Sequence, residues 1–147
     1  MYYTKSELIK LGFSSVGENN KISKLSKFYA VNGSTLGSNN RIDDYCLFKG
    51  KIEFGNYIHV AGFCLFSAVG DFIKIDNYVG FSSHCSLFTA TEDFISPTLI
   101  SPAMNKEYSK SITGKIIVGE SVKLGTHCVV LPNVTMGYGS PSAANMI

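Results

Sequence analysis

Hydrophobic residues recur at every sixth position along most of the chain, which is neither the spacing of an amphipathic helix nor the alternation of a half-buried strand. Sixteen of the seventeen repeat starts are apolar, and Ser142 is the exception. Grouped in threes, the starts are Val16, Ile22 and Phe28; Leu36, Ile42 and Phe48; Phe54, Val60 and Phe66; Ile75, Phe81 and Leu87; Val118, Leu124 and Val130; and Met136 with Ser142. Three units make a triangular turn of about eighteen residues, and such turns stack at strand spacing, roughly 4.8 Å. The pattern predicts an all-β, single-stranded parallel β-helix.

The second position of each unit is small or acidic, as at Gly17, Gly37 and Asp43, and asparagine follows at Asn19 and Asn39. Glycine and asparagine tolerate the left-handed backbone conformations that tight corners need. Each unit is therefore expected to be a short strand followed by a corner.

A short helix is expected before the first repeat. Thr4 and Glu7 have the spacing of a capping box, and Gly12 is a natural helix C-cap. The first dozen residues therefore predict one helix.

All four cysteines, Cys46, Cys64, Cys85 and Cys128, occupy the fifth position of the middle unit of their triplet. They are therefore expected to form one interior column. A redox or metal site would be the functional interpretation, but parallel side chains on stacked turns are poorly placed for disulfides. We interpret the column as buried thiols that act as small hydrophobic side chains.

Three insertions interrupt the repeat, which is expected to be regular over 16–90 and 115–140. Short insertions near 32–34 and 70–72 should bulge from corners. A long loop at about 91–114 leaves the solenoid. Long loops on a compact domain are usually functional or disordered, and we interpret this one as an active-site arm.

Composition narrows the function classes. At 147 residues and 45% hydrophobic, the chain is expected to form a single domain over 1–147. The formal charge of +2 comes without a polybasic run, which argues against nucleic acid or a membrane surface as partner. No apolar stretch approaches the roughly 18 residues of a membrane span, and no signal peptide is evident. The sequence predicts a soluble, cytoplasmic protein without membrane insertion.

Three stretches carry a family resemblance: FGNYIHVA at 54–61, LFTATEDF at 87–94 and VGESVKLGTHCVVLPNVTMGYGS at 118–140. With them the chain resembles the left-handed β-helix hexapeptide-repeat acyltransferases. It is most similar to the branch that acetylates lipopolysaccharide and capsule precursors, related to the galactoside and maltose acetyltransferases. The resemblance implies a left-handed helix, a homotrimer with sites between adjacent prisms, and acetyl transfer from acetyl-CoA to a hydroxyl or amino group of a sugar or nucleotide-sugar acceptor.

The resemblance also implies the catalytic candidates His59, Glu92 and Asp93. In the galactoside and maltose branch a histidine directly after the TAT-like segment is the general base, whereas this chain has Glu92 there, followed by Asp93. His59 matches an acceptor-contacting position. An ordinary histidine, with a pKa of about 6.5, is closer to neutrality than a glutamate at about 4.3. We predict that His59 is the base and that Glu92 orients the imidazole or the acceptor, with Glu92 as the alternative base.

The acetyl-CoA side of the site is expected on the late coils, without a metal ion. The resemblance places oxyanion donors among the backbone amides near Gly125 and Thr126. Lys123, Lys115 and, at lower rank, Lys74 are candidates to face the phosphates of CoA as point charges.

Two alternatives remain open. The sequence ends at SPSAANMI, where family members continue for one or two coils, so the chain is expected to be truncated. CoA binding would then be weakened, and the protein could be a structural protein without activity. The other alternative is a trimeric metal-dependent hydrase, although His59, His84 and His127 lie 25 and 43 residues apart with no close pair.

Overall fold

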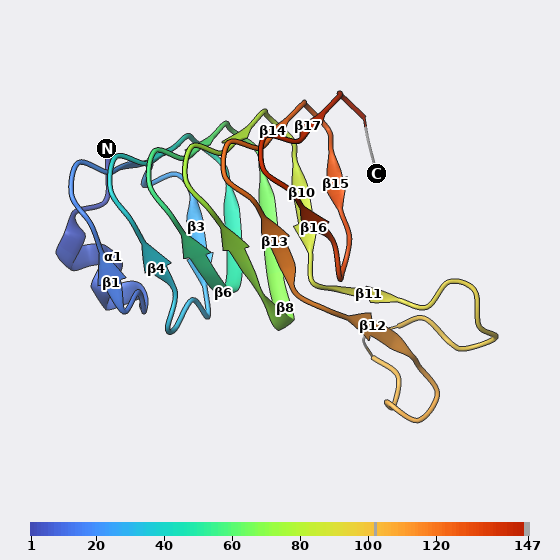
Figure 1. The fold of residues 1–147 in the computed structure, drawn as a ribbon. Coiled ribbons are helices and arrows are strands. Elements are labelled where there is room, and N and C mark those ends of the chain that lie inside the picture. Colours follow the sequence, from blue (N-terminus) through green and yellow to red (C-terminus); the bar gives the residue numbers. More distant parts are fainter. Residues whose placement is uncertain (102, 146–147) are drawn as a thin grey trace.

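The computed structural model describes residues 1–101 and 103–145, which wind into a β-solenoid with one short helix at its N-terminal end (Figure 1). Strands of successive turns pair in parallel and form three columns. The first column holds β1 (Ser15–Val16), β4 (Thr35–Leu36), the end of β6 (Leu47–Phe54), the end of β8 (Leu65–Ile75), β13 (Ile116–Val118) and β16 (Thr135–Met136). The second holds β2 (Lys21–Ile22), β5 (Arg41–Ile42), β7 (His59–Val60), β9 (Gly80–Phe81), β14 (Lys123–Leu124) and β17 (Pro141–Ser142). The third holds β3 (Lys27–Tyr29), the starts of β6 and β8, β10 (Ser86–Phe88) and β15 (Val129–Val130).

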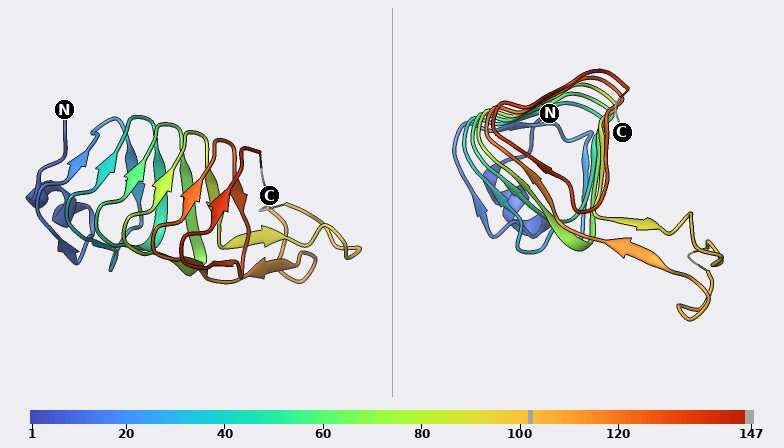
Figure 2. Two further views of the ribbon diagram at one scale, coloured as in Figure 1. Left: turned by 45° about the horizontal axis from the view of Figure 1, so that its top comes forward. Right: turned by 45° about the vertical axis from the view of Figure 1, so that its right-hand side comes forward.

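The strand register confirms the predicted repeat. The second-column starts follow one another from coil to coil, as Ile42 pairs with Ile22 on one side and with Val60 on the other. The first and third columns stack in the same way. The end-on view shows the triangular outline of the turns (Figure 2). The prediction of a left-handed parallel β-helix with an N-terminal helix and a protruding loop is confirmed. The insertion at 70–72 lies inside the long strand β8, so this strand turns the corner without a break.

Helix α1 (Lys5–Leu11) closes the N-terminal end of the solenoid (Figure 1). The predicted capping box is present, since Thr4 Oγ1 accepts a hydrogen bond from the Glu7 amide and the Glu7 carboxylate accepts one from the Thr4 amide. Gly12 ends the helix as predicted. Leu8 is buried and joins the core, so the helix is held by its one apolar side chain that faces the first coil.

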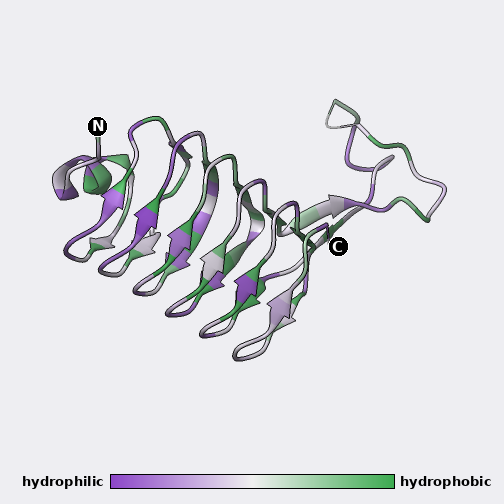
Figure 3. Ribbon diagram, turned by 90° about the horizontal axis from the view of Figure 1, so that it is seen from above, coloured by the Kyte–Doolittle hydropathy of each residue, from purple (hydrophilic) through white to green (hydrophobic). Residues whose placement is uncertain are grey.

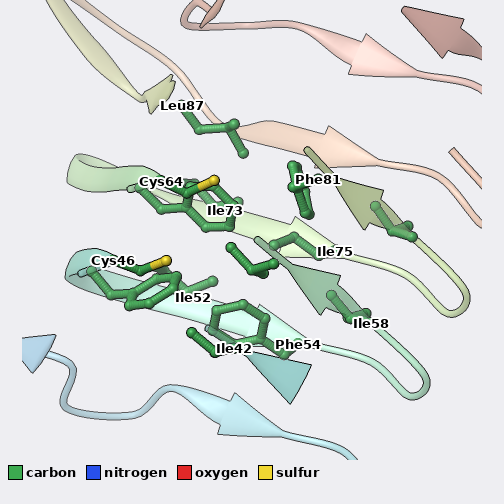
Figure 4. Packing of buried hydrophobic residues seen from close by; sticks show 14 of the residues in the cluster. Ile42, Cys46, Ile52, Phe54, Ile58, Cys64, Ile73, Ile75, Phe81 and Leu87 are labelled. Atoms are coloured by element: carbon green, nitrogen blue, oxygen red, sulfur yellow. The ribbon is translucent and has the colours of Figure 1, made fainter. Parts of the chain in front are cut away.

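The interior of the prism is one continuous hydrophobic cluster (Figure 4). Phenylalanines of successive coils pack edge to face along it: the Phe48 and Phe66 ring centroids are 5.2 Å apart, and those of Phe66 and Phe81 are 4.7 Å apart. Viewed from above, hydrophilic and hydrophobic positions alternate along the strands (Figure 3). Burial of the repeat starts therefore supplies most of the driving force for winding.

The cysteines form the predicted interior column. Cys46, Cys64, Cys85 and Cys128 are all free thiols, and all are buried. Each donates a hydrogen bond to a backbone carbonyl of the following coil, and Cys46 Sγ, for example, lies 3.2 Å from the Ala61 oxygen. The thiols therefore act as small side chains that also satisfy corner carbonyls.

The prediction that second-position glycines adopt a left-handed backbone at the corners is wrong. Left-handed φ values occur at the fourth position of the unit, where Asn19 and Asn39 have φ of 58° and 61°. Gly37, at the second position, has no such φ. A Cβ atom there would lie 2.2 Å from the carbonyl oxygen of Gly55 in the next coil. Small residues at this position are needed for the close approach of successive coils, not for a left-handed backbone.

Candidate active site

A groove of about 560 Å³ runs across the outer surface of the second column, over β7, β9 and β14. Its lining includes the side chains or backbone of Tyr57, His59, Tyr78, Gly80, Ser83 and Lys123. Parallel pairing places Gly80 directly between His59 and Lys123, so the backbones of these two residues lie about 9–10 Å apart along the column. The groove is bounded by two prism corners.

His59 is held by a carboxylate of the preceding coil. Its Nε2 atom lies 2.9 Å from Asp43 Oδ2, and Arg41 Nε donates to the other carboxylate oxygen at 2.6 Å. Partial burial opposes ionisation of Asp43, but its hydrogen bonds with His59 and Arg41 outweigh this effect and lower the pKa of the carboxyl. The His59 side chain is half exposed and faces the groove from one end. A carboxylate that fixes an imidazole through one nitrogen leaves the other nitrogen to a substrate.

Glu92 lies at the base of the predicted arm. Strands β11 (Ala90–Glu92) and β12 (Ser111–Thr113) pair antiparallel and form the base of the arm where it leaves the solenoid (Figure 2). The Oε2 atom of Glu92 is buried and has no hydrogen-bond partner among the described residues. A buried acceptor without a partner is costly, so this oxygen is ready to receive a donor from a bound molecule or a second chain.

Asp93 has a structural position in this chain. Its carboxylate accepts hydrogen bonds from the Ser96 hydroxyl at 2.6 Å and from the backbone amides of Ser96 and Ile95 at 3.1 and 3.0 Å. Lys110 lies 3.5 Å away. The Ser96 hydroxyl, with these amides, lowers the pKa of Asp93 far below its ordinary range. These contacts fix the first turn of the arm, and Asp93 stays a catalytic candidate.

The structure does not bring His59 and Glu92 together within one chain. His59 begins the second column, whereas Glu92 follows the end of the third, so they lie at different corners of the prism. The side chain bonded to the His59 imidazole is Asp43. The prediction that Glu92 orients His59 is therefore not met inside a single chain.

The residues predicted for acetyl-CoA have separate surroundings. Lys123 is exposed beside the groove, while Lys115 is exposed on the segment that returns from the arm. The Gly125 amide already donates to the Ser142 carbonyl at 2.9 Å in the strand ladder. Thr126 Oγ1 donates to the Ser83 carbonyl at 2.7 Å. Gly125 is thus committed to coil stacking, and Lys123 is the candidate nearest to the groove.

The other two histidines belong to a corner. His84 and His127 stack with ring centroids 4.7 Å apart, both with left-handed φ, and do not join His59. Over 1–101 and 103–145, no three His, Cys, Asp or Glu residues gather in a way that could hold a metal ion. Among the described residues of one chain, the three histidines therefore do not form a common site.

Sequence reasoning missed Asp43, Ser83 and Gly80. The signal for Asp43 was present, because His59 follows it by sixteen residues and a coil advances by about eighteen, which places the two side chains on neighbouring coils. Ser83 and Gly80 were hidden because small residues fill so many positions of the repeat.

Comparison with known proteins identifies the family. No protein-family model matches the chain. The dTDP-4-amino-4,6-dideoxy-D-glucose acyltransferase of Escherichia coli is 33% identical over 146 residues, covering 97% of this chain and 76% of the relative. The chain belongs to this acyltransferase family. The matched region spans nearly the whole of this acyltransferase chain.

Solved structures agree with this assignment. A variant of AntD, an N-acyltransferase from Bacillus cereus, in complex with dTDP and coenzyme A, superposes with a TM-score of 0.92 at 34% identity, covering 98% of this chain and 77% of that one. AntD with dTDP and 3-hydroxybutyryl-CoA gives a TM-score of 0.89 at 34% identity, covering 97% and 76%. No helix among the described residues of this acyltransferase combines the length and apolar character needed to cross a membrane.

Proposed function

We propose that this protein transfers an acyl group from acyl-CoA to the amino group of a dTDP-linked amino sugar. The observation that carries the proposal is the likeness to AntD over 98% of this chain and 77% of that one. Solved AntD complexes hold dTDP-4-amino-4,6-dideoxyglucose and coenzyme A in one variant and 3-hydroxybutyryl-CoA in another structure. Acetyl is the acyl group expected from the sequence, and an amine acceptor resolves the choice between nitrogen and oxygen that the sequence left open.

The reaction joins the acceptor nitrogen to the thioester carbonyl carbon and then breaks the carbon–sulfur bond, so that CoA leaves as the thiol. The attacking amine must be neutral, and the nitrogen loses one proton, which the departing sulfur finally receives. A base near the acceptor is therefore needed most when the amine arrives as an ammonium ion. No step needs a metal ion.

His59 is our candidate for that base. Its imidazole is anchored through Nε2 to Asp43 and is half exposed at the end of the groove. This anchoring fixes the ring orientation and leaves Nδ1 to face an acceptor. Asp43 acts as a positioning residue, because it touches the imidazole and not the proposed substrate.

We propose that Glu92 and Asp93, at the base of the arm, contact the acceptor. The unpartnered Oε2 atom of Glu92 fits a donor such as an ammonium or hydroxyl group. The AntD structures include variants in which a serine and an aspartate ten residues apart are replaced. Ser83 and Asp93 have the same residue types and the same separation in this chain, which supports testing both beside His59.

We further propose a homotrimer, because His59 and Glu92 lie at different corners of one prism and can meet only across two copies. The arm carries exposed apolar side chains at its tip and base, with Phe94 73% and Ile95 97% exposed. Such side chains are usually covered by a partner. Work on lipopolysaccharide or capsule precursors and a cytoplasmic location stay predictions.

A thiol-release assay tests the function. The protein is incubated with acetyl-CoA or 3-hydroxybutyryl-CoA and with dTDP-4-amino-4,6-dideoxyglucose, other dTDP-amino sugars and dTDP-glucose. We expect free thiol to appear fastest with an amino sugar and to match the formation of an N-acyl product by mass. Thiol release no faster than without acceptor, for every pair, would refute the proposal and favour a structural protein.

A further inference from the structure

Gly80 is the first residue of β9, in the middle of the six-stranded second column. The corresponding positions of the neighbouring coils carry long or ring side chains, which are Arg41, His59 and Lys123. Gly80 thus opens a gap in an otherwise continuous row of side chains. The gap lies at the floor of the groove.

Nothing in the fold requires glycine at this position. The φ of Gly80 lies outside the left-handed region, and a Cβ atom there would meet no described atom within 4 Å. Among the fourteen glycines, no other combines an ordinary φ with an entirely open Cβ position in the described structure. By contrast, a Cβ on Gly37 would clash with the next coil. Glycine weakens a strand, and an isolated one often marks the close approach of a ligand to the backbone.

The walls of the groove suit a phosphorylated nucleotide. Tyr57 and Tyr78 stack at 5.3 Å with an interplanar angle of 16°, and both are about half exposed. The next residues along this corner are Asn39 and Ser121, so the outer ring faces of the pair have no further ring on them. Aromatic faces stack with nucleobases. Lys123 makes no ion pair with any residue that the structure describes, and lysine binds phosphate as a point charge.

We propose that Gly80 determines the specificity of this groove: its missing side chain lets the diphosphate-bearing part of a nucleotide lie against the β9 backbone between His59 and Lys123. Tyr57 and Tyr78 then line the path of the nucleoside. The inference rests on the proposed function, in which both substrates carry a nucleoside diphosphate, the acceptor as dTDP and the donor as CoA. The shared chemistry is the diphosphate ester, and binding experiments separate the two sources.

The test measures the binding of dTDP alone and of CoA alone by calorimetry, together with the melting temperature. In Gly80→Val the β-branched side chain favours the strand, so the melting temperature should stay the same or rise. The same side chain occupies the groove, and affinity for one of the two ligands should fall at least tenfold. The ligand that loses affinity is the one that lies on Gly80. Gly80→Ala should show the same pattern with a smaller loss.

Gly137→Val is the matched control. Gly137 also has an ordinary φ, its Cβ position is 3.8 Å from the nearest atom, and it lies outside the groove, so both affinities should stay within threefold of wild type. Unchanged affinity for both ligands in Gly80→Val would overturn the inference. So would a falling melting temperature in Gly80→Val and Gly80→Ala, or an equal loss of affinity in Gly137→Val. Because binding is measured without turnover, absence of acyl transfer in the wild type would refute only the proposed function.

Discussion

His59 and Asp43 lie sixteen residues apart and meet across two neighbouring coils, with His59 Nε2 2.9 Å from Asp43 Oδ2. His59 lines the groove, and Asp43 occupies the second position of a repeat unit on the preceding coil. Their contact therefore couples the winding of the solenoid to the orientation of an imidazole at the candidate site.

Replacing His59 tests its role as base. We expect His59→Asn to lower kcat by roughly 10²-fold, the lower end of the usual range for general base catalysis. Affinity for acetyl-CoA should change little, since the base contacts the acceptor. Steady-state kinetics on one accepted amino sugar separate kcat from KM. An unchanged kcat would show that another group, with Glu92 as the first candidate, takes the proton.

Replacing Asp43 tests positioning. Asp43→Asn keeps the shape of the side chain but removes the negative charge that holds His59, so kcat should fall less than in His59→Asn. Steady-state kinetics should show this loss in kcat with little change in the KM for acetyl-CoA, because Asp43 contacts the imidazole and not CoA. A kcat equal to that of the wild type would remove Asp43 from the mechanism.

Alanine should destabilise the fold at one glycine and be tolerated at another. Gly37→Ala forces a Cβ atom to within 2.2 Å of the Gly55 carbonyl oxygen, and we expect it to lower the free energy of unfolding by about 1–3 kcal/mol. Gly137→Ala meets only ordinary contact at 3.8 Å and should be close to neutral. Urea denaturation followed by circular dichroism compares them. Equal stabilities would show that coil spacing relaxes more readily than the structure implies.

Acid should remove the contribution of the Glu7 carboxylate to the stability of the N-terminal helix. Hydrogen bonds from Lys24 and from the Thr4 amide lower the pKa of Glu7 from 4.5 to about 2. Because the folded pKa is the lower one, this contribution to stability is present above about pH 4.5 and is lost as pH falls towards 2. The difference in denaturation midpoint between wild type and Glu7→Gln should therefore shrink below pH 4.5. A difference that stays constant from pH 7 to pH 3 would contradict this account.

The arm should be needed for assembly. Replacing both Phe94 and Ile95 by serine removes two highly exposed apolar side chains and should weaken trimer formation at least tenfold, without unfolding the solenoid. Sedimentation over a concentration series measures this change. Ile9→Ser, on the exposed face of α1, is the control and should leave assembly unchanged. A double variant that assembles like wild type would place the subunit interface elsewhere.

The sequence was sufficient for the winding and its register, because every coil repeats one burial rule. Val16, Ile22 and Phe28 already define the three columns, and each later triplet confirms the same phase. The cysteine column followed from the same rule. The role of the second-position glycines did not follow, since close approach between coils depends on three-dimensional spacing and is not visible in local conformational preference.

The site was harder to predict than the fold. His59 was identified from the family resemblance, but its partner Asp43 was missed because the pair is formed by the stacking of coils. Asp93 was predicted as catalytic from the resemblance, but its contacts with Ser96, Ile95 and Lys110 were not predicted, because they form in a turn that no repeat pattern describes. Residues in the arm escape periodic reasoning because the arm has no period.

The first three residues pair with the first coil, and this pairing affects the tendency of the protein to aggregate. A stack of parallel strands exposes, at each end, a row of backbone groups that can template the addition of another molecule. In this protein two such groups of the first coil are already engaged, as the Ile22 carbonyl accepts from the Tyr3 amide at 2.8 Å and the Lys24 amide donates to the Met1 carbonyl at 2.9 Å. These groups of the second column are therefore unavailable to an added strand, which disfavours edge-on, head-to-tail growth of identical copies at this end.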